Sequence, residues 1–589
     1  AIAADEDSVA AHLAHSYALQ ANFDLPAADK AARTAVQKDN THAIAWARVA
    51  ELHLSMGELD KGLAAAKRAT EMDAGLGRTQ TMLGFAYLLK FETANAKQAF
   101  QRSIKLDSSD PLARLGNGLA LIREGNITQG RREIEIAASL DTNNAQVRSY
   151  LGKAYLEEKR NKLAGEQFEL AKQMDPRDPT PWLYSAILKQ SKNDPTGALY
   201  DLRISRELNN NRAVFRSSQH LDADVAVRNV GLAAIYSDLG AAQQALDIGT
   251  EAVSQNHANH SAHRFLADTY IRLPRHKIAR VSELLQSQLL QPLSSQPIMP
   301  QLAEANPGLN TSLGFDNALG EYHTLFDKEA TRFRFNAFTG SHGIAGGDAT
   351  VSGLHQSFAY SVGKFHYEND GFRVNNDLKQ DIGNIFLQSA VTPRTTIQAE
   401  FRRVESEYGD LFMLFDPARF SASTRSTRDA DIGRVGLHHR LNSNSDIVLS
   451  VLNRDSLVSR TTPTTVVQTI PLPTPPGPGV SVSVQEQINT IDSDSDTFEI
   501  QYIGKQDKNK YIFGLGYFDE KRNDVDSFND TTTFDAVLQG FFGLPPSITN
   551  NVTTVTNVDA SYKNSYLYYN RELSDRWMMT VGLAYDDLE

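Results

Sequence analysis

Residues 145–178 read AQVRSYLGKAYLEEKRNKLAGEQFELAKQMDPRD. Shifting back by 34 residues gives GRTQTMLGFAYLLKFETANAKQAFQRSIKLDSSD at 77–110. Both copies hold a Leu-Gly pair, a Tyr three residues later, and an Ala followed after four residues by a Phe. A fixed period of this length is typical of stacked-repeat architectures. The residues that mark the repeat are Trp46, Leu83, Gly84, Tyr87, Ala96, Phe100, Gly118, Leu151, Gly152, Tyr155, Ala164, Phe168, Ala171, Pro176 and Trp182.

The same frame covers most of the first half of the chain. It includes 9–42 and 111–144, resumes at 226–259 after an insert near 213–225, and begins a last unit near residue 260. Each unit is predicted to be a pair of antiparallel helices, with small residues where the helices approach and aromatic residues between neighbours. One unit cannot bury its apolar face alone, so the units should stack into a solenoid. We therefore interpret the marked residues as packing residues.

The repeat resembles the tetratricopeptide repeat family over roughly residues 9–290. The resemblance implies a concave groove that binds protein segments or extended polymers. It implies no chemistry.

Composition excludes several classes of function. The chain has 589 residues, a formal net charge of -12 and no cysteine. Thiolate catalysis, Cys-ligated zinc and disulfides are therefore ruled out, and a nucleic-acid partner is not expected. The N-terminal AIAADEDSVA fits either a mature N-terminus after cleavage or a fragment edge.

No motif for catalysis or for a cofactor stands out. The sequence lacks a nucleophile elbow, a P-loop and a dinucleotide glycine pattern, so no catalytic residue, cofactor or enzymatic activity is predicted. The glycine-rich 340–348 follows a predicted strand and precedes no helix, which indicates a loop. His257, His260 and His263 are spaced by three residues, but no carboxylate pattern completes a metal site, so none is predicted.

The apolar period changes after a linker. Residues 291–310 are rich in Pro, Ser and Gln, and we place the solenoid at 1–290, the linker at 291–330 and a β domain at 331–589. In the β domain the apolar residues alternate, as in TRFRFNAFT near 331 and TIQAEFRR near 395. About eleven strands are expected. They lie near 331–339, 349–356, 359–369, 380–391, 395–406, 430–441, 446–455, 496–505, 510–521, 559–571 and 576–586.

Connection lengths distinguish a soluble sandwich from a transmembrane barrel. Short joints at 392–394, 442–445, 506–509 and 572–575 alternate with long polar ones near 407–429, 456–495 and 522–558. This alternation favours an antiparallel transmembrane β-barrel with tight turns on one side and long loops on the other. The polar residues predicted on its inner face either line a channel or form a mutual charge network. They are Arg334, Glu400, Arg402 and Glu499.

The odd strand number has a consequence. Bacterial single-chain barrels have an even number of strands, so the barrel is expected to be incomplete within this chain. Residues 576–586 should then form the last strand of a curved sheet, with an unpaired edge.

The order of solenoid and barrel resembles the outer-membrane exporters of cellulose and poly-N-acetylglucosamine. The resemblance implies a transport or secretion protein of the bacterial outer membrane. Its periplasmic solenoid would bind a partner protein, a client or an extended polymer, and its barrel would contact lipid. The alternative function is an outer-membrane receptor or anchor with a repeat scaffold for protein interaction, in which long loops such as 461–487 bind ligands. A soluble repeat scaffold carrying a β-sandwich is a third interpretation.

Overall fold

The computed structural model describes 5–208, 229–270, 277–293 and 329–589, with short gaps inside these ranges. The gaps are residues 23, 57, 91, 230, 231, 234, 237, 238, 412–419, 443, 473–476, 507, 575 and 576. The insert expected near 213–225 and most of the linker lie outside the described residues.

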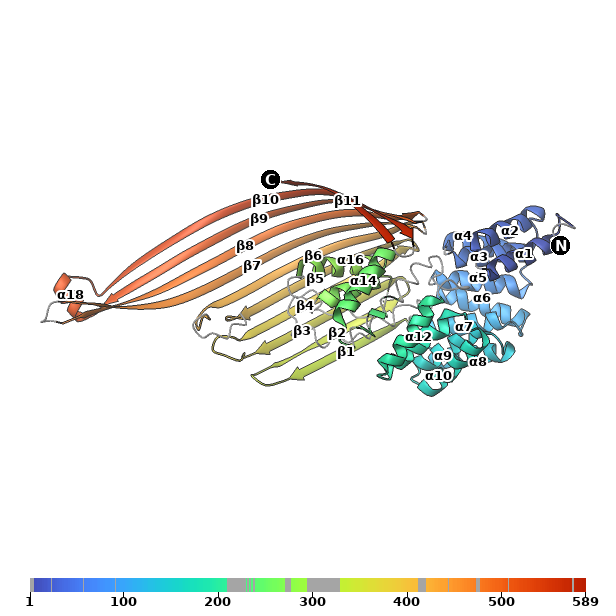
Figure 1. The fold of residues 1–589 in the computed structure, drawn as a ribbon, viewed down its shortest axis with the longest axis horizontal. Helices are drawn as coiled ribbons and strands as arrows, with labels where there is room; N and C mark the ends of the chain where they lie inside the picture. Colours follow the sequence, from blue (N-terminus) through green and yellow to red (C-terminus); the bar gives the residue numbers. More distant parts are fainter. Residues whose placement is uncertain are drawn as a thin grey trace.

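The first half of the chain is a row of antiparallel helix pairs (Figure 1). Most of the helices begin and end at the same positions of each 34-residue repeat. The helices are α1 (Val9–Ala21), α2 (Leu25–Lys38), α3 (Ala43–Ser55), α4 (Leu59–Met72), α5 (Gly77–Leu89), α6 (Thr93–Leu106), α7 (Pro111–Arg123), α8 (Ile127–Leu140), α9 (Ala145–Glu157), α10 (Asn161–Met174), α11 (Pro179–Ser191), α12 (Pro195–Glu207), α14 (Ala242–Gln255), α15 (His260–Tyr270) and α16 (Lys277–Leu290).

Local sequence explains where these helices begin. Asp110 and Asp178 each precede a proline, and their carboxylates accept hydrogen bonds from backbone N–H groups of the first turn. An N-terminal Asp caps the free N–H groups, and proline at the first helical position is already in a helical conformation. The repeat therefore encodes its own helix boundaries.

Glycine lets the two helices of a pair approach closely. A Cβ at Gly152 would lie 2.4 Å from Cε1 of Phe168, and one at Gly84 would lie 2.6 Å from Cε1 of Phe100. Both Phe rings are fully buried. The small residues and the aromatic rings of the repeat thus fill one continuous core.

Most of the other marked residues also lie in this core. Leu151, Ala96, Ala164 and Ala171 are buried, and Tyr155 is 8% exposed. Trp46, Leu83 and Tyr87 are partly buried against the same core, Gly118 lies buried against Gly130, and Trp182 is half-buried.

The expectation that Pro176 is a packing residue was wrong. Pro176 is exposed in the turn between α10 and α11. Proline lacks the backbone N–H that would continue a helix, so its contribution is to stop α10 rather than to fill the core.

The second half is an open antiparallel sheet of eleven strands in sequence order. The expected strand number, antiparallel pairing and unclosed edge are confirmed: β11 pairs with β10, and the sheet is not closed. The strands are β1 (Ala330–Thr339), β2 (Ala345–His355), β3 (Phe358–Asn369), β4 (Leu378–Thr392), β5 (Thr395–Tyr408), β6 (Arg425–Asn442), β7 (Ser445–Ile470), β8 (Gly479–Gln506), β9 (Asn509–Phe534), β10 (Ser547–Ser574) and β11 (Trp577–Leu588), with helix α18 (Ala536–Phe542) between β9 and β10.

Connections differ at the two ends of the sheet. Even-numbered strands pass to the next strand through two residues, at 356–357, 393–394, 443–444, 507–508 and 575–576. Odd-numbered strands pass through longer segments. The predicted asymmetry of connection lengths is therefore present in this chain.

Two of the predicted long loops are instead largely strand. β7 and β8 stay in register over 456–470 and 479–493, for example with Leu457 opposite Asp492, and β9 and β10 do so over 522–533 and 547–558. We call these extended parts of β7 to β10 the blade, which reaches well beyond the other strands (Figure 1). The predicted loops were wrong because Thr, Val and Ile at alternate positions sustain strand pairing even where Asp, Asn and Ser fill the remaining positions.

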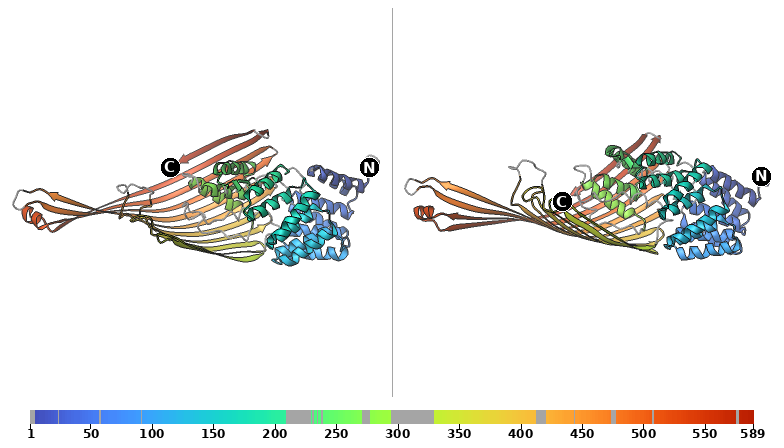
Figure 2. Two further views of the ribbon diagram at one scale, coloured as in Figure 1. Left: turned by 60° about the horizontal axis from the view of Figure 1, so that its bottom comes forward. Right: turned by 90° about the horizontal axis from the view of Figure 1, so that it is seen from below.

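The two faces of the sheet differ in polarity. One face exposes apolar side chains across the strands, while the other buries polar ones and receives the last helices of the solenoid (Figure 2). We call the second one the inner face. Exposed apolar residues of the first face include Phe333, Phe335, Val362, Ile385, Phe401, Val435, Val451, Phe498, Phe513 and Leu583.

Candidate functional site at the solenoid–sheet junction

Helix α16 lies on the inner face through a small apolar contact. Leu289 and Leu290 pack with Val448 of β7 and Ile503 of β8. Leu289 also packs over Gly436 of β6. A Cβ added at Gly436 would lie only 2.4 Å from Cδ2 of Leu289. The glycine therefore allows the close approach of the helix to the sheet.

A polar cluster on β4, β5 and β6 continues this contact. Arg434 donates to Gln288 of α16 at 2.6 Å and to Glu400 of β5 at 2.8 Å. The other oxygen of Glu400 accepts from Asn384 of β4 at 2.8 Å. Arg434 is only 4% exposed, so its charge depends on these partners. We call Gln288, Arg434, Glu400 and Asn384 the latch.

A second polar contact lies on β8 and β10. Gln286 of α16 donates to Gln501 at 2.7 Å, and Gln501 donates to the hydroxyl of Tyr566 at 3.0 Å. Tyr566 in turn donates to Glu499 at 2.6 Å. A neutral helix residue is thus joined to a carboxylate of the sheet through a chain of hydrogen bonds.

The sheet also reaches the solenoid on both sides of α16. Lys510 of β9 donates to the carbonyl oxygen of Ser254, in the last turn of α14, at 2.8 Å, and to Glu572 at 2.7 Å. A cation there is favoured by the helix dipole. At the other side Gln388 of β4 donates to the carbonyl oxygen of Gln291 at 2.9 Å.

Two further contacts involve earlier repeats. Arg394, in the β4–β5 turn, lies 3.4 Å from Asp60 of α4. The backbone N–H of Glu329 donates to the carbonyl oxygen of Arg123, at the end of α7, at 2.8 Å. The Arg394 pair is solvent-exposed, so it contributes only about 0–1 kcal/mol.

The four predicted inner-face residues are not one cluster. Glu400 and Arg402 lie two residues apart on β5, and Glu400 belongs to the latch. Arg334 is half-buried on β1, opposite Thr350, and Glu499 lies exposed on β8 beside Tyr566. The inner face thus carries the predicted charges at separate places.

Sequence reasoning missed the residues that join the two domains. Arg434, Gln288, Gln501 and Lys510 make the junction, yet none of them belongs to a motif. The alternation around Arg434 could have placed it on the same face as the glycine at 436. Its pairing with Glu400 depends on the strand register, which the sequence does not display.

Of the three histidines, His263 joins α16 to the segment that holds His257. His263 contacts Glu283 of α16 at 2.5 Å through Nδ1 and the carbonyl oxygen of His257 at 2.9 Å through Nε2. Burial, with His263 and Lys510 nearby, lowers the pKa of His257 to about 4. Within the described ranges no three His, Asp or Glu side chains are arranged to hold a metal ion.

Charged residues inside the solenoid mostly satisfy one another. Arg48 of α3 is 1% exposed, stacks on the Tyr17 ring at 3.7 Å and donates to the hydroxyl of Ser16 at 3.0 Å. Its guanidinium lies 3.2 Å from Glu51, which also pairs with Arg78 of α5 at 2.9 Å. This network joins α1, α3 and α5 and is structural.

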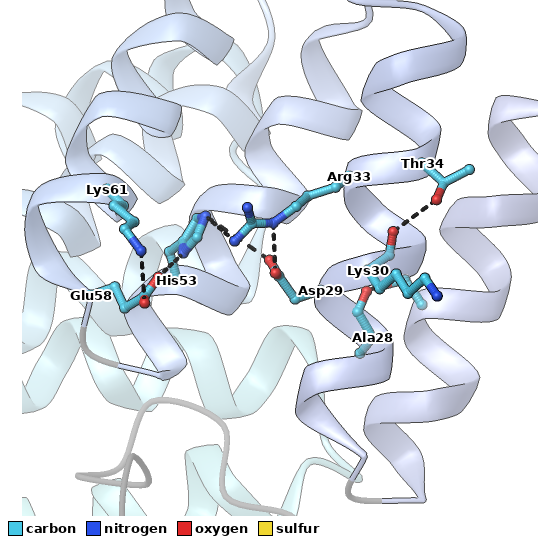
Figure 3. A network of polar contacts seen from close by, with 9 residues as sticks. Ala28, Asp29, Lys30, Arg33, Thr34, His53, Glu58 and Lys61 are labelled. Carbon is cyan, nitrogen blue, oxygen red and sulfur yellow. Dashed lines mark hydrogen bonds and ion pairs between the residues drawn. The ribbon is translucent and has the colours of Figure 1, made fainter. Parts of the chain in front are cut away.

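A neighbouring network links α2, α3 and α4 (Figure 3). Glu58 lies 2.6 Å from Nδ1 of His53 and 2.9 Å from Lys61, while Arg33 pairs with Asp29 at 2.6 Å. Burial raises the pKa of Glu58, but the hydrogen bonds from Lys61 and His53 outweigh it and lower the pKa overall. These charges likewise stabilise the stacking of repeats.

None of the helices in the described part of the chain has the length and hydropathy of a membrane-spanning segment.

Comparisons with known proteins bear on the repeats alone. Residues 77–110, which form α5 and α6, match the family model described as "Tetratricopeptide repeat". No curated protein matches the sequence.

Several solved structures resemble part of the chain. The chain of the APC/C hetero-tetramer Cut9-Hcn1 is 16% identical, with 48% of this chain and 54% of that chain covered and a TM-score of 0.42. The thermophilic repeat protein TTC0263 of Thermus thermophilus is 18% identical over 31% of this chain and 99% of that one, with a TM-score of 0.29. Yeast Tom70 is 16% identical over 45% and 54%, with a TM-score of 0.34.

The matched pair of helices is one unit of a regular series. The helix pairs before and after it begin and end at the same positions of the repeat. The packing of a glycine against an aromatic ring also recurs, as Gly152 with Phe168 shows. The N-terminal part of the chain is therefore a tetratricopeptide-repeat solenoid, followed by an open eleven-stranded antiparallel sheet.

Proposed function

We propose that the protein is a transport or secretion protein of the bacterial outer membrane. In this proposal the periplasmic solenoid binds a partner protein, a client or an extended polymer and presents it to the inner face of the sheet, which forms part of a β-barrel pore. One observation carries the proposal: the sheet has an exposed apolar face, and the end of the solenoid lies on its opposite, polar face.

The exposed apolar face suits contact with lipid. Phe333 and Phe335 of β1 are 71% and 65% exposed, and Phe401 of β5 is 48% exposed. Exposed apolar surface of this extent marks an interaction with another apolar phase. β1 to β5 have 10 to 15 residues, which meets the length of about 9–11 residues that a tilted strand needs to cross a bilayer.

The connections support the same orientation. The two-residue connections lie at the solenoid end of the strands, where Arg394 contacts Asp60. Outer-membrane barrels have short turns on the periplasmic side and long loops outside. The solenoid is accordingly proposed to be periplasmic.

The solenoid would act by raising local concentration. Tetratricopeptide repeats imply a scaffold for protein–protein interaction, and this scaffold is tethered to the mouth of the proposed pore. A cargo held there meets the pore at an effective concentration set by the tether, so strong affinity for the pore itself is unnecessary.

Solute release from liposomes tests the proposal. The purified full-length protein, reconstituted into liposomes loaded with solutes and soluble polymers of graded size, is expected to release at least the smaller ones. A protein that is monodisperse without detergent, or that releases nothing, contradicts the proposal.

The blade favours a second candidate, an outer-membrane receptor or anchor. Its strands carry a surface far from the solenoid, ending at α18, where Phe541 and Phe542 are 49% and 54% exposed. Ligand binding at such a surface needs no pore. Removing the blade would abolish ligand binding in this case and leave solute release unchanged.

A further inference from the structure

We propose that α16 is a reversible plug, held on the inner face of the sheet by the latch and released when cargo passes. This inference rests on the proposed function for the route of cargo, because the plug closes a route along the inner face. The docking itself rests only on the contacts of α16.

The position of α16 is the first argument. The helix contacts β6 through Gln288 and Leu289, and β7 and β8 through Leu289, Leu290 and Gln286. Arg434 links it further to Glu400 of β5. Figures 1 and 2 place the helix over the middle strands, on one side of the sheet. The residues that it contacts belong to the polar inner face. Any cargo that moved along these strands would meet the helix.

The chemistry of the contact is the second argument. The helix side offers neutral groups to the sheet: the amides of Gln286 and Gln288 and the carbonyl oxygen of Gln291. The charged residue that it meets, Arg434, keeps Glu400 as a partner within the sheet when the helix leaves. Undocking therefore leaves the buried Arg434 charge with a partner. An unpaired buried charge would make undocking costly.

Lys510 likewise keeps an ionic partner within the sheet when the helices leave. It donates to the carbonyl oxygen of Ser254 on α14, but its ionic partner Glu572 lies on the sheet. A permanent domain interface is typically more hydrophobic. Here the apolar part of the α16 contact consists mainly of Leu289 and Leu290. The interface has the composition of a contact that opens and closes.

Gln398 of β5 provides a probe of the docked state. Its side chain is only 2% exposed. It lies beside Gly436, the glycine under Leu289, because a Cβ added at Gly436 would be 2.9 Å from Cγ of Gln398. Because the chain contains no cysteine, Gln398→Cys adds a unique thiol close to the docked helix. Its reaction with a bulky, membrane-impermeant maleimide measures how often the inner face is uncovered.

The labelling experiment compares the Gln398→Cys protein in detergent with and without Gln288→Ala and Leu289→Ala. The paired changes weaken both the latch and the apolar contact, so labelling is expected to be at least about tenfold faster. Leu202→Ala, which removes a buried leucine from α12 away from the sheet, is the matched control and should leave the rate unchanged. Equal rates with and without the paired changes, or fast labelling of the protein that carries only Gln398→Cys, overturn the plug.

A disulfide lock connects the plug to transport. Leu289→Cys with Gly436→Cys places two thiols where the wild-type side chain and backbone nearly touch. Oxidation is expected to reduce release from liposomes at least about tenfold, and reduction should restore it, while each single-cysteine variant is insensitive. Release that the oxidised lock does not change contradicts the plug.

The two experiments separate the two proposals. If labelling responds to the paired changes but no variant releases any solute, the proposed pore is wrong and the reversible docking of α16 stands. If solutes are released but labelling does not respond, the pore stands and the plug is wrong.

Discussion

Arg434 of β6 lies directly opposite Glu400 of β5, and its guanidinium donates to that carboxylate at 2.8 Å while also donating to Gln288 of α16 at 2.6 Å. The pair therefore belongs to the sheet, and the helix joins it as a third, neutral member. The same arginine stabilises the inner face and holds the end of the solenoid, so stability and docking can be separated by choosing which partner to remove.

Removing the arginine alone should be costly. Arg434→Met leaves the Glu400 carboxylate, whose side chain is 12% exposed, without its cation, and we expect a loss of about 3–5 kcal/mol in the free energy of unfolding. Arg434→Met with Glu400→Gln should recover more than half of this loss. Denaturant unfolding in detergent micelles measures both.

The matched control is an exposed arginine of the same sheet. Arg403 of β5 pairs with Glu405 and Asp431, and its side chain is 58% exposed, so Arg403→Met should change stability by about 1 kcal/mol or less. Equal losses at Arg434 and Arg403 would show that the latch is not a buried ion pair.

Gly152→Ala should destabilise the solenoid. The added methyl group would lie 2.4 Å from Cε1 of the buried Phe168, and overpacking of this kind costs about 1–3 kcal/mol. Gly165→Ala on α10 is the control, because its Cβ would lie 3.4 Å from the nearest atom, Cδ2 of Leu188. Alanine there should stabilise the helix by about 0.5–1 kcal/mol. Thermal loss of helical circular dichroism should therefore shift in opposite directions for the two variants.

The repeat half was predictable because its information is local. Leu151, Gly152, Tyr155 and Phe168 recur at a fixed period, and each one packs within its own unit or the next. Pro176 was misplaced because the period marks a position without saying whether it packs or terminates a helix.

The sheet half was predictable only in part. Alternation placed Glu400 and Arg402 on the inner face, but it could not give the partner strand of each residue, so Arg434 was missed. The blade was missed because Asp, Asn and Ser fill many of its positions, and these residues are typical of loops. Pairing across the strands, such as Val525 with Val555, is a tertiary property.

Acidification should loosen the junction. His257 has a folded-state pKa of about 4, below the usual 6.5, because of burial and of the neighbouring His263 and Lys510. The folded protein therefore binds a proton at His257 less readily than the unfolded chain does. This contribution to the free energy of unfolding is complete above about pH 6.5 and is lost as the pH falls towards about 4.

The pH dependence has a direct control. His257→Gln should remove part of the stability loss between about pH 6.5 and 4, at most ~3 kcal/mol. The nearby pair of His263 and Glu283, whose side chains lie 2.5 Å apart, is unchanged in this variant. Unfolding measured at steps across this range compares the two proteins, and identical pH profiles would exclude His257 as the responsive group.

Removing the blade should leave the inner face and the plug intact. The shortened chain joins Asp455 to Asp494, and Lys521 to Asp559, through two-residue turns. It keeps the paired strand residues between the blade and the solenoid, such as Val451 with Phe498. The latch and the α16 contacts lie on the retained part of the strands, so solute release and the slow labelling of Gln398→Cys should both persist. The full-length protein reconstituted in parallel is the reference. If the shortened protein folds, with its lower strand amides still protected from hydrogen exchange, but releases nothing, then the blade itself forms part of the route, and the inner face alone does not carry the transport that we propose.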